Sequence, residues 1–241
     1  ELLFARDLIK ERNGDLFIGT KNSKLPNTLQ SIIQGFVNRN QSRQALDFIQ
    51  RFNIRDIQDL IASAALLLHT DTVEALLNHT GGVRNLVLNE RLWKALLWYT
   101  AANGDIILAE SVLKTLSSQD PTLTCCGWMT SDALKDDCIH FSALAAYLGH
   151  VDYLKWYFRT IRLEKRPKSA LNRSVLHFAC LGGHEDLAKL LVSDFEFDPT
   201  EEDSNSWNAV HCAIASNAAG LVCWMLDCEA YHTKAKSPTL D

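Results

Sequence analysis

The feature that most constrains this chain is a near-repeat in its last third. The segment SVLHFACLGGHEDLAKLL occupies residues 174–191, and NAVHCAIASNAAGLVCWML occupies residues 208–226. His177 and His211 hold equivalent places in the two segments and lie 34 positions apart. Such a period is typical of repeat proteins built from helix pairs. One pair cannot bury its apolar face alone, so the units must stack, and stacking produces an extended concave surface that suits a macromolecular partner.

Earlier parts of the chain keep the same frame. The place of His177 is taken by Ala143, Trp98 and Ala62 in three segments that span residues 140–158, 95–113 and 59–81. A poorer helix pair is predicted over residues 29–49 from its apolar periodicity, and an N-terminal capping helix over residues 2–12. These segments together predict about six units.

The segment at 174–191 resembles the ankyrin repeat. The family signature Thr-Pro-Leu-His-x-Ala is matched by residues 174–179, and Gly183 and His184 follow. The resemblance implies that Ser174 caps the first helix, that His177 hydrogen-bonds between neighbouring hairpins and that Gly183 ends the helix. Small residues such as Ala179 would let the paired helices approach. The unit at 140–158 has no such Thr-like residue and no equivalent of His177, so we expect weaker caps there.

The implied fold is all-α: an ankyrin-repeat solenoid of stacked helix-turn-helix units with hairpin loops between them. The resemblance is most specific over residues 138–228. Tetratricopeptide repeats share the period, and HEAT or armadillo repeats are longer. The polar stretches at 161–173 and 194–207 are long enough for the projecting hairpins of ankyrin repeats and favour that family.

The expected organisation has four parts. Residues 1–26 form the capping helix and a linker, and residues 27–228 form the repeats. An insertion at 117–137 follows from a spacing of 45 positions between Trp98 and Ala143. Residues 229–241 form a tail that either covers the last unit or begins a further repeat.

The ankyrin register predicts which side chains face the concave groove. Ligands of the family usually contact the hairpin tips and the exposed turn of each first helix. The corresponding apolar or arginine side chains are Ile139, Tyr147, Leu148, Arg173, Leu181 and Trp207. Exposed aromatic and aliphatic clusters mark binding surfaces, and Trp, Tyr and Arg dominate interface energetics. The alternative is that Tyr147 and Leu181 pack against neighbouring repeats.

Charged side chains gather in the two hairpin stretches. Residues 159–173 carry six basic side chains and one glutamate, whereas residues 194–203 carry six carboxylates. Neighbouring hairpins lie close together in a stack, so we expect the two loops to neutralise each other rather than to bind an external anion.

Catalytic and metal-binding patterns are weak. Cys125, Cys126, Cys138 and His140 lack the paired spacing of a zinc site. No nucleophile, phosphate-binding or metalloprotease motif occurs, so we predict no enzyme activity and no cofactor. A hydrolase or transferase built on the insertion is a remote alternative.

Composition narrows the remaining possibilities. The net charge of −5 argues against a nucleic-acid partner, and no apolar run is long enough for a membrane span. Seven cysteines, several of them in helical segments, favour reduced thiols and an intracellular, cytoplasmic location. We therefore predict a monomeric, non-catalytic interaction module that binds a protein or peptide on its concave face. The alternative is a targeting or regulatory domain of a larger enzyme or channel.

Overall fold

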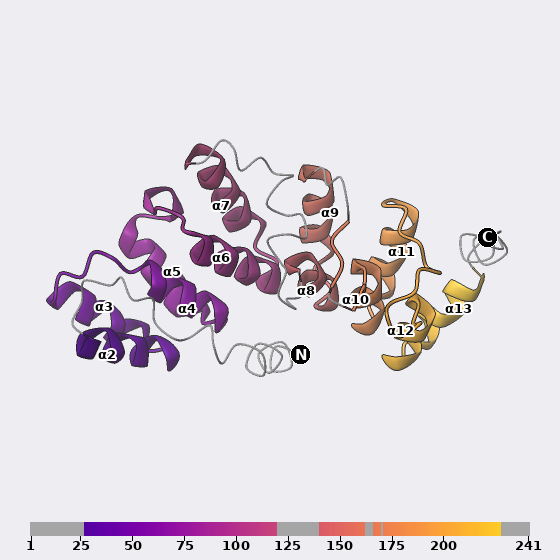
Figure 1. The fold of residues 1–241 in the computed structure, drawn as a ribbon, viewed down its shortest axis with the longest axis horizontal. Coiled ribbons are helices and arrows are strands. Elements are labelled where there is room, and N and C mark those ends of the chain that lie inside the picture. Colours follow the sequence, from indigo (N-terminus) through magenta and orange to yellow (C-terminus); the bar gives the residue numbers. More distant parts are fainter. Residues whose placement is uncertain (1–26, 120–139, 162–165, 170, 228–241) are drawn as a thin grey trace. The chain divides into compact units, whose positions relative to one another are not determined.

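The computed structural model describes residues 27–119, 140–161, 166–169 and 171–227 (Figure 1). All regular secondary structure in these ranges is helical and consists of twelve α-helices and one short 3₁₀ helix. The helices form two compact units. The first unit comprises residues 1–100 and 105–122, and the second comprises residues 101–104 and 123–241.

The first unit contains three helix pairs. They are α2 (Asn27–Asn38) with α3 (Ser42–Arg51), α4 (Gln58–Leu66) with α5 (Thr70–Thr80), and α6 (Glu90–Asn103) with α7 (Ile106–Gln119); the 3₁₀ helix η1 (Val83–Asn85) lies between the second and third pairs. Helix α2 packs on α4 and helix α3 packs on α5, so equivalent helices stack on each other. The last three residues of α6 belong to the second unit.

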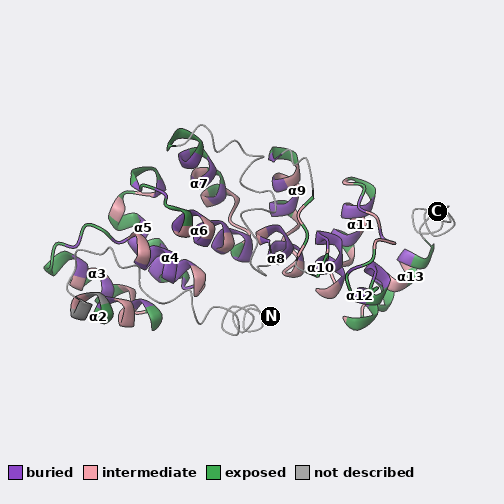
Figure 2. Cartoon of the chain, viewed as in Figure 1, coloured by how far each residue is buried: buried purple, intermediate pink, exposed green. Residues whose placement is uncertain are grey.

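The second unit contains three further pairs. They are α8 (Phe141–Tyr147) with α9 (Val151–Thr160), α10 (Val175–Leu181) with α11 (Glu185–Ser193), and α12 (Ala209–Ala215) with α13 (Ala219–Asp227). The first helices α8, α10 and α12 pack in succession, and α11 packs on α13. The all-α fold of stacked helix pairs is thus confirmed. Most residues of α8 and α10 are buried (Figure 2).

Each first helix of the second unit is followed by a left-handed residue, one position after its C-cap. These residues are Gly149, Gly183 and Asn217, with φ of 78°, 72° and 58°, and they repeat the spacing of 34 positions. Glycine takes this conformation without a Cβ penalty, and asparagine tolerates it better than most residues. The chain therefore reverses at the same point in each pair, which places each second helix against its own first helix.

The helix starts follow the same spacing, at His140, Ser174 and Asn208. At the start of α8 the His140 side chain takes the role of the Thr-like residue that the unit at 140–158 lacks. Its Nδ1 accepts from the Ser142 backbone N–H at 3.2 Å and lies 2.6 Å from the Ser142 hydroxyl. Asn208 Oδ1 accepts from the backbone N–H groups of Val210 and His211 in α12.

Small side chains bring the first helices close together. Ala143, Ala145 and Ala146 of α8 and Ala179 of α10 are all buried. They leave room for the large buried side chains Tyr153, Leu154 and Tyr157 of α9, so the core lies between the first and second helices.

Several predicted features lie outside the described residues. They are the capping helix at 2–12, almost all of the insertion at 117–137, Cys125, Cys126, Cys138, Ile139 and the tail at 229–241. In the parts of the chain that the structure describes, no helix is long and apolar enough to cross a membrane.

Candidate functional site

His177 ties the second pair of the unit to the hairpin of the third. Its Nε2–H donates to the Trp207 backbone carbonyl at 3.0 Å. Its Nδ1 accepts from the Ser174 backbone N–H at 3.2 Å and lies 2.8 Å from the Ser174 hydroxyl. Burial lowers the pKa of His177, and this outweighs the opposite effect of the Trp207 carbonyl. A neutral ring can accept at one nitrogen and donate at the other, as both bonds require.

A second row of hydrogen bonds joins the pairs at the opposite end of the first helices. His184 Nε2 donates to the Tyr147 carbonyl at 2.9 Å, and His150 Nε2 donates to the Ala102 carbonyl at 2.9 Å. The Ser216 hydroxyl donates to the Cys180 carbonyl at 2.7 Å. Both ends of the stacked first helices are therefore held by buried or half-buried polar contacts.

Trp207 is exposed and yet held in place. The Asp203 carboxylate accepts from the backbone N–H of Trp207 at 2.9 Å and from Arg173 Nε at 2.7 Å. The Arg173 guanidinium lies 6.0 Å from the centre of the Trp207 ring. The His211 ring stacks on the Trp207 ring, with 6.4 Å between the two ring centres. The Trp207 side chain is still 39% exposed, so its ring offers a pre-positioned apolar contact.

The Asp203 carboxyl group is nearly inaccessible to solvent. Burial alone would raise its pKa, but hydrogen bonds from Arg173, Trp207 and Asn205 outweigh burial and hold the pKa below its ordinary value. Arg173 was predicted to contact a partner, and this stays a prediction. In the structure its guanidinium pairs with Asp203, where it supports Trp207.

The other predicted groove residues line the first helices. Tyr147, Leu148 and Leu181 are half-buried at the ends of α8 and α10, and Ile139 lies outside the described residues. The exposed apolar residues that were missed in the hairpin before α10 and in α12 are Leu171 at 44% and Ile214 at 60%. Leu171 could have been found from its place in the polar stretch 161–173, which was predicted to form a hairpin; in the structure its carbonyl accepts from the Ser204 backbone N–H at 2.9 Å. No sequence signal marks Ile214, since the equivalent Cys180 is buried.

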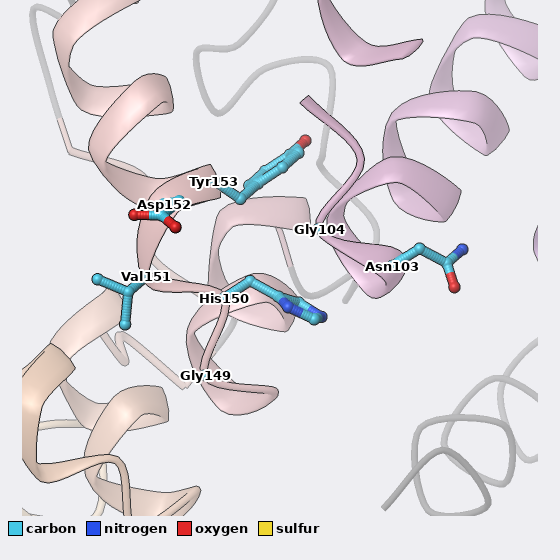
Figure 3. A pocket seen from close by; sticks show the side chains of 7 residues that line it. All are labelled: Asn103, Gly104, Gly149, His150, Val151, Asp152 and Tyr153. Atoms are coloured by element: carbon cyan, nitrogen blue, oxygen red, sulfur yellow. The ribbon is translucent and has the colours of Figure 1, made fainter. Parts of the chain in front are cut away.

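A shallow polar cavity lies where the first and second helices of the α8/α9 pair meet residues 103 and 104. Its volume is about 320 Å³, and it is lined by Asn103, Gly104, Gly149, His150, Val151, Asp152 and Tyr153. The His150 ring points towards Asn103 and Gly104, whereas the Asp152 side chain points away from that ring (Figure 3). His150 Nε2 is already bonded to Ala102, so this cavity brings together no acid, base and nucleophile.

The described residues offer little for metal binding or covalent catalysis. Within the described ranges no group of three or more His, Cys, Asp or Glu side chains could hold a metal ion. Burial raises the pKa of the Cys212 thiol to about 11 and raises that of Cys180 further. Both side chains therefore stay as thiols near neutral pH, whereas the thiolate is the nucleophile.

The basic and acidic hairpin stretches pair with each other. Lys168 Nζ lies 2.5 Å from Glu201, and Arg173 pairs with Asp203. Arg166 donates to the carbonyls of Phe195 and Glu196, and its guanidinium lies 4.3 Å from the centre of the Phe197 ring. These contacts use the basic side chains of residues 166–173 internally, as the opposed charges of the loops suggested.

Comparison with known proteins identifies part of the chain. Residues 142–236 match the family model of ankyrin repeats, in three copies. This range contains almost all of the pairs α8/α9, α10/α11 and α12/α13, which confirms the resemblance drawn from residues 174–191. No curated protein matches the sequence.

One solved structure that resembles the chain is the crystal structure of the yeast ribosomal protein Rps3 in complex with its chaperone Yar1. The TM-score is 0.45 and the identity 19%, and the match covers 58% of this chain and 95% of the other.

Proposed function

From the premise that residues 142–236 are ankyrin repeats, we propose that the chain is a non-catalytic interaction module. Its surface of first helices and hairpins, within residues 140–227, binds a protein segment. Stacked repeats present extended surfaces of this kind, and binding there needs no chemistry from the chain. The buried free thiols Cys180 and Cys212 suit a reducing, intracellular compartment.

The observation that carries the proposal is the geometry of Trp207. Its ring is exposed at the hairpin, and its backbone is fixed by Asp203 on one side and His177 on the other. A rigid, exposed tryptophan loses little conformational entropy on binding, and tryptophan is enriched among the residues that dominate interface energies. Leu171, Leu181 and Tyr147 extend the apolar surface along α10 and α8.

The test is affinity capture from a cell extract with the parent chain and a Tyr147→Ala, Leu181→Ala, Trp207→Ala variant. The matched control is a Phe52→Ala, Val87→Ala, Ile107→Ala variant, which removes exposed apolar side chains from the first unit. We expect a protein that the parent and the control retain and the groove variant loses, with unchanged melting curves.

Tyr147 and Leu181 are half-buried, so the single Trp207→Ala variant is included to separate binding from folding. Equal retention by the parent and by a folded Trp207→Ala variant would refute the proposed surface.

A further inference from the structure

The two units differ in charge. The described residues of the second unit carry ten Asp or Glu side chains and six Lys or Arg side chains. Those of the first unit carry eight of each. The acidic excess of the described residues is therefore confined to the unit that holds the ankyrin repeats.

Within this unit, the helices that form the proposed surface are uncharged. Helices α8, α10 and α12 contain no Asp, Glu, Lys or Arg. The charged side chains lie beyond their ends, in the hairpins before them and in the second helices after them. The surface is thus an apolar strip whose two rims carry the charges.

Glu202 is the most informative carboxylate at the hairpin rim. It is exposed, and the structure gives it no ion pair among the described residues. The Asn172 amide donates to the Glu202 carbonyl at 3.4 Å, and the next residue, Asp203, holds Trp207. Glu202 therefore lies beside the hairpin that carries the exposed Leu171 and the half-buried Arg173. It is also close to Trp207 in the sequence.

The opposite rim carries Asp152 and Asp186. Both are exposed in the first turns of α9 and α11, a place where a carboxylate also favours the helix dipole. Glu185 beside them pairs with Lys189 at 2.6 Å. Glu202 has no such helical role and no ion pair among the described residues, so local structure does not explain its charge.

The basic side chains nearest the hairpin rim are engaged internally. Lys168 pairs with Glu201, Arg173 pairs with Asp203, and Arg166 binds two backbone carbonyls. A ligand that approaches Leu171 and Trp207 therefore meets the Glu202 carboxylate, which has no ion pair among the described residues, and no available cation among residues 166–173.

Building on the proposed function, we infer that the partner segment is amphipathic and basic. Its aliphatic or aromatic side chains contact Leu171, Leu181 and Trp207, while Lys or Arg side chains reach Glu202 at one rim and Asp186 at the other. Complementary charges across an interface accelerate encounter and reject partners of the wrong sign. Acidic segments and nucleic acids are disfavoured by the same carboxylates.

The test uses three fluorescent sixteen-residue peptides that share the same leucine positions. Their polar positions are all Lys, all Gln or all Glu, and binding is followed by fluorescence anisotropy at low and high salt. We expect the Lys peptide to bind tightest and the Glu peptide weakest, with the difference shrinking as salt rises. An exposed ion pair changes affinity by about two- to fivefold, so Glu202→Gln should weaken the Lys peptide by about that factor.

Glu110→Gln is the matched control, because Glu110 is an exposed carboxylate of α7 in the first unit. The Glu110→Gln variant should bind all three peptides as tightly as the parent does. The Glu202→Gln variant should bind the Gln peptide as tightly as the parent does. The inference is overturned if the Lys peptide does not bind, if the Gln or Glu peptide binds as tightly, or if Glu202→Gln has no effect. If the Trp207→Ala variant then loses binding of the Gln peptide, the proposed surface is still supported. If the Trp207→Ala variant binds the peptides as tightly as the parent, both the proposed surface and the inference of a basic partner are refuted.

Discussion

Replacing Gly182 with alanine should loosen the stack where α10 meets α8. Gly182 caps α10 with φ of −79° and ψ of −9°, which any residue adopts, so the reason for glycine here is space. An added Cβ would lie 2.4 Å from the Tyr147 carbonyl oxygen and 2.6 Å from the His184 ring. Real Cβ atoms do not approach this closely, so the two pairs would have to separate.

The size of the effect follows from two costs and one gain. Overpacking a tight contact costs about 1–3 kcal/mol, and weakening the His184 to Tyr147 hydrogen bond costs about 0.5–1.5 kcal/mol. Alanine restricts the unfolded chain more than glycine and returns about 0.4–1 kcal/mol. We expect the free energy of unfolding to fall by about 1–3 kcal/mol.

The assay is urea unfolding followed by circular dichroism. Gly35→Ala is the matched control, because Gly35 lies inside α2 and nothing is within 4 Å of an added Cβ. That variant should be more stable than the parent by about 0.5–1 kcal/mol, since alanine is the better helix former. A Gly182→Ala variant as stable as the parent, or a shift of the same sign in both variants, would refute this account of the packing.

Two further predictions concern titration and the Trp207 support. Burial lowers the pKa of His140 to about 3 from an ordinary 6.5. Below pH 6.5 the unfolded chain binds a proton at His140 that the folded chain does not bind, so the free energy of unfolding falls as the pH is lowered from 6.5 towards 3. Between pH 6.5 and 5 the free energy of unfolding of the parent should fall by about 2 kcal/mol because of His140. A His140→Asn variant keeps a capping oxygen but cannot titrate, so its free energy of unfolding should fall less over the same range. Equal slopes of unfolding free energy against pH in the two proteins would contradict this. Asp203→Asn should lower the free energy of unfolding by about 1–3 kcal/mol by removing the charge-assisted bond to Arg173, whereas Asp186→Asn at an exposed site should change it by less than about 0.5 kcal/mol, and thermal melts of both variants decide the point.

The sequence predicted the helix pairs well because their determinants are local. The cap at Ser174, the buried small residue Ala179 and the turn at Gly183 lie within ten residues of one another, and the same order recurs 34 positions later. The capping residue of α8 was not predicted, because residue preferences for helix caps favour Ser, Thr, Asp and Asn, and histidine is not among them. His140 caps α8 through a ring nitrogen, which accepts from the Ser142 backbone N–H.

The candidate surface was less predictable because exposure depends on neighbours distant in the chain. Register alone placed Arg173 at the surface but did not show that its guanidinium is held by Asp203, thirty positions away. Ile214 is exposed although the equivalent Cys180 of the preceding pair is buried in α10, which packs on α12. A repeat pattern thus fixes where a side chain points along its own helix more reliably than what lies against it.

The most direct test of the account is site-specific photocrosslinking of the partner recovered by affinity capture. The photoreactive residue p-benzoylphenylalanine would replace Trp207 in one variant and Ile107, an 83% exposed residue of α7, in another. The account predicts a crosslinked complex from position 207 and none from position 107. A crosslink from position 107 alone, with the complex still formed, would show that the partner binds elsewhere.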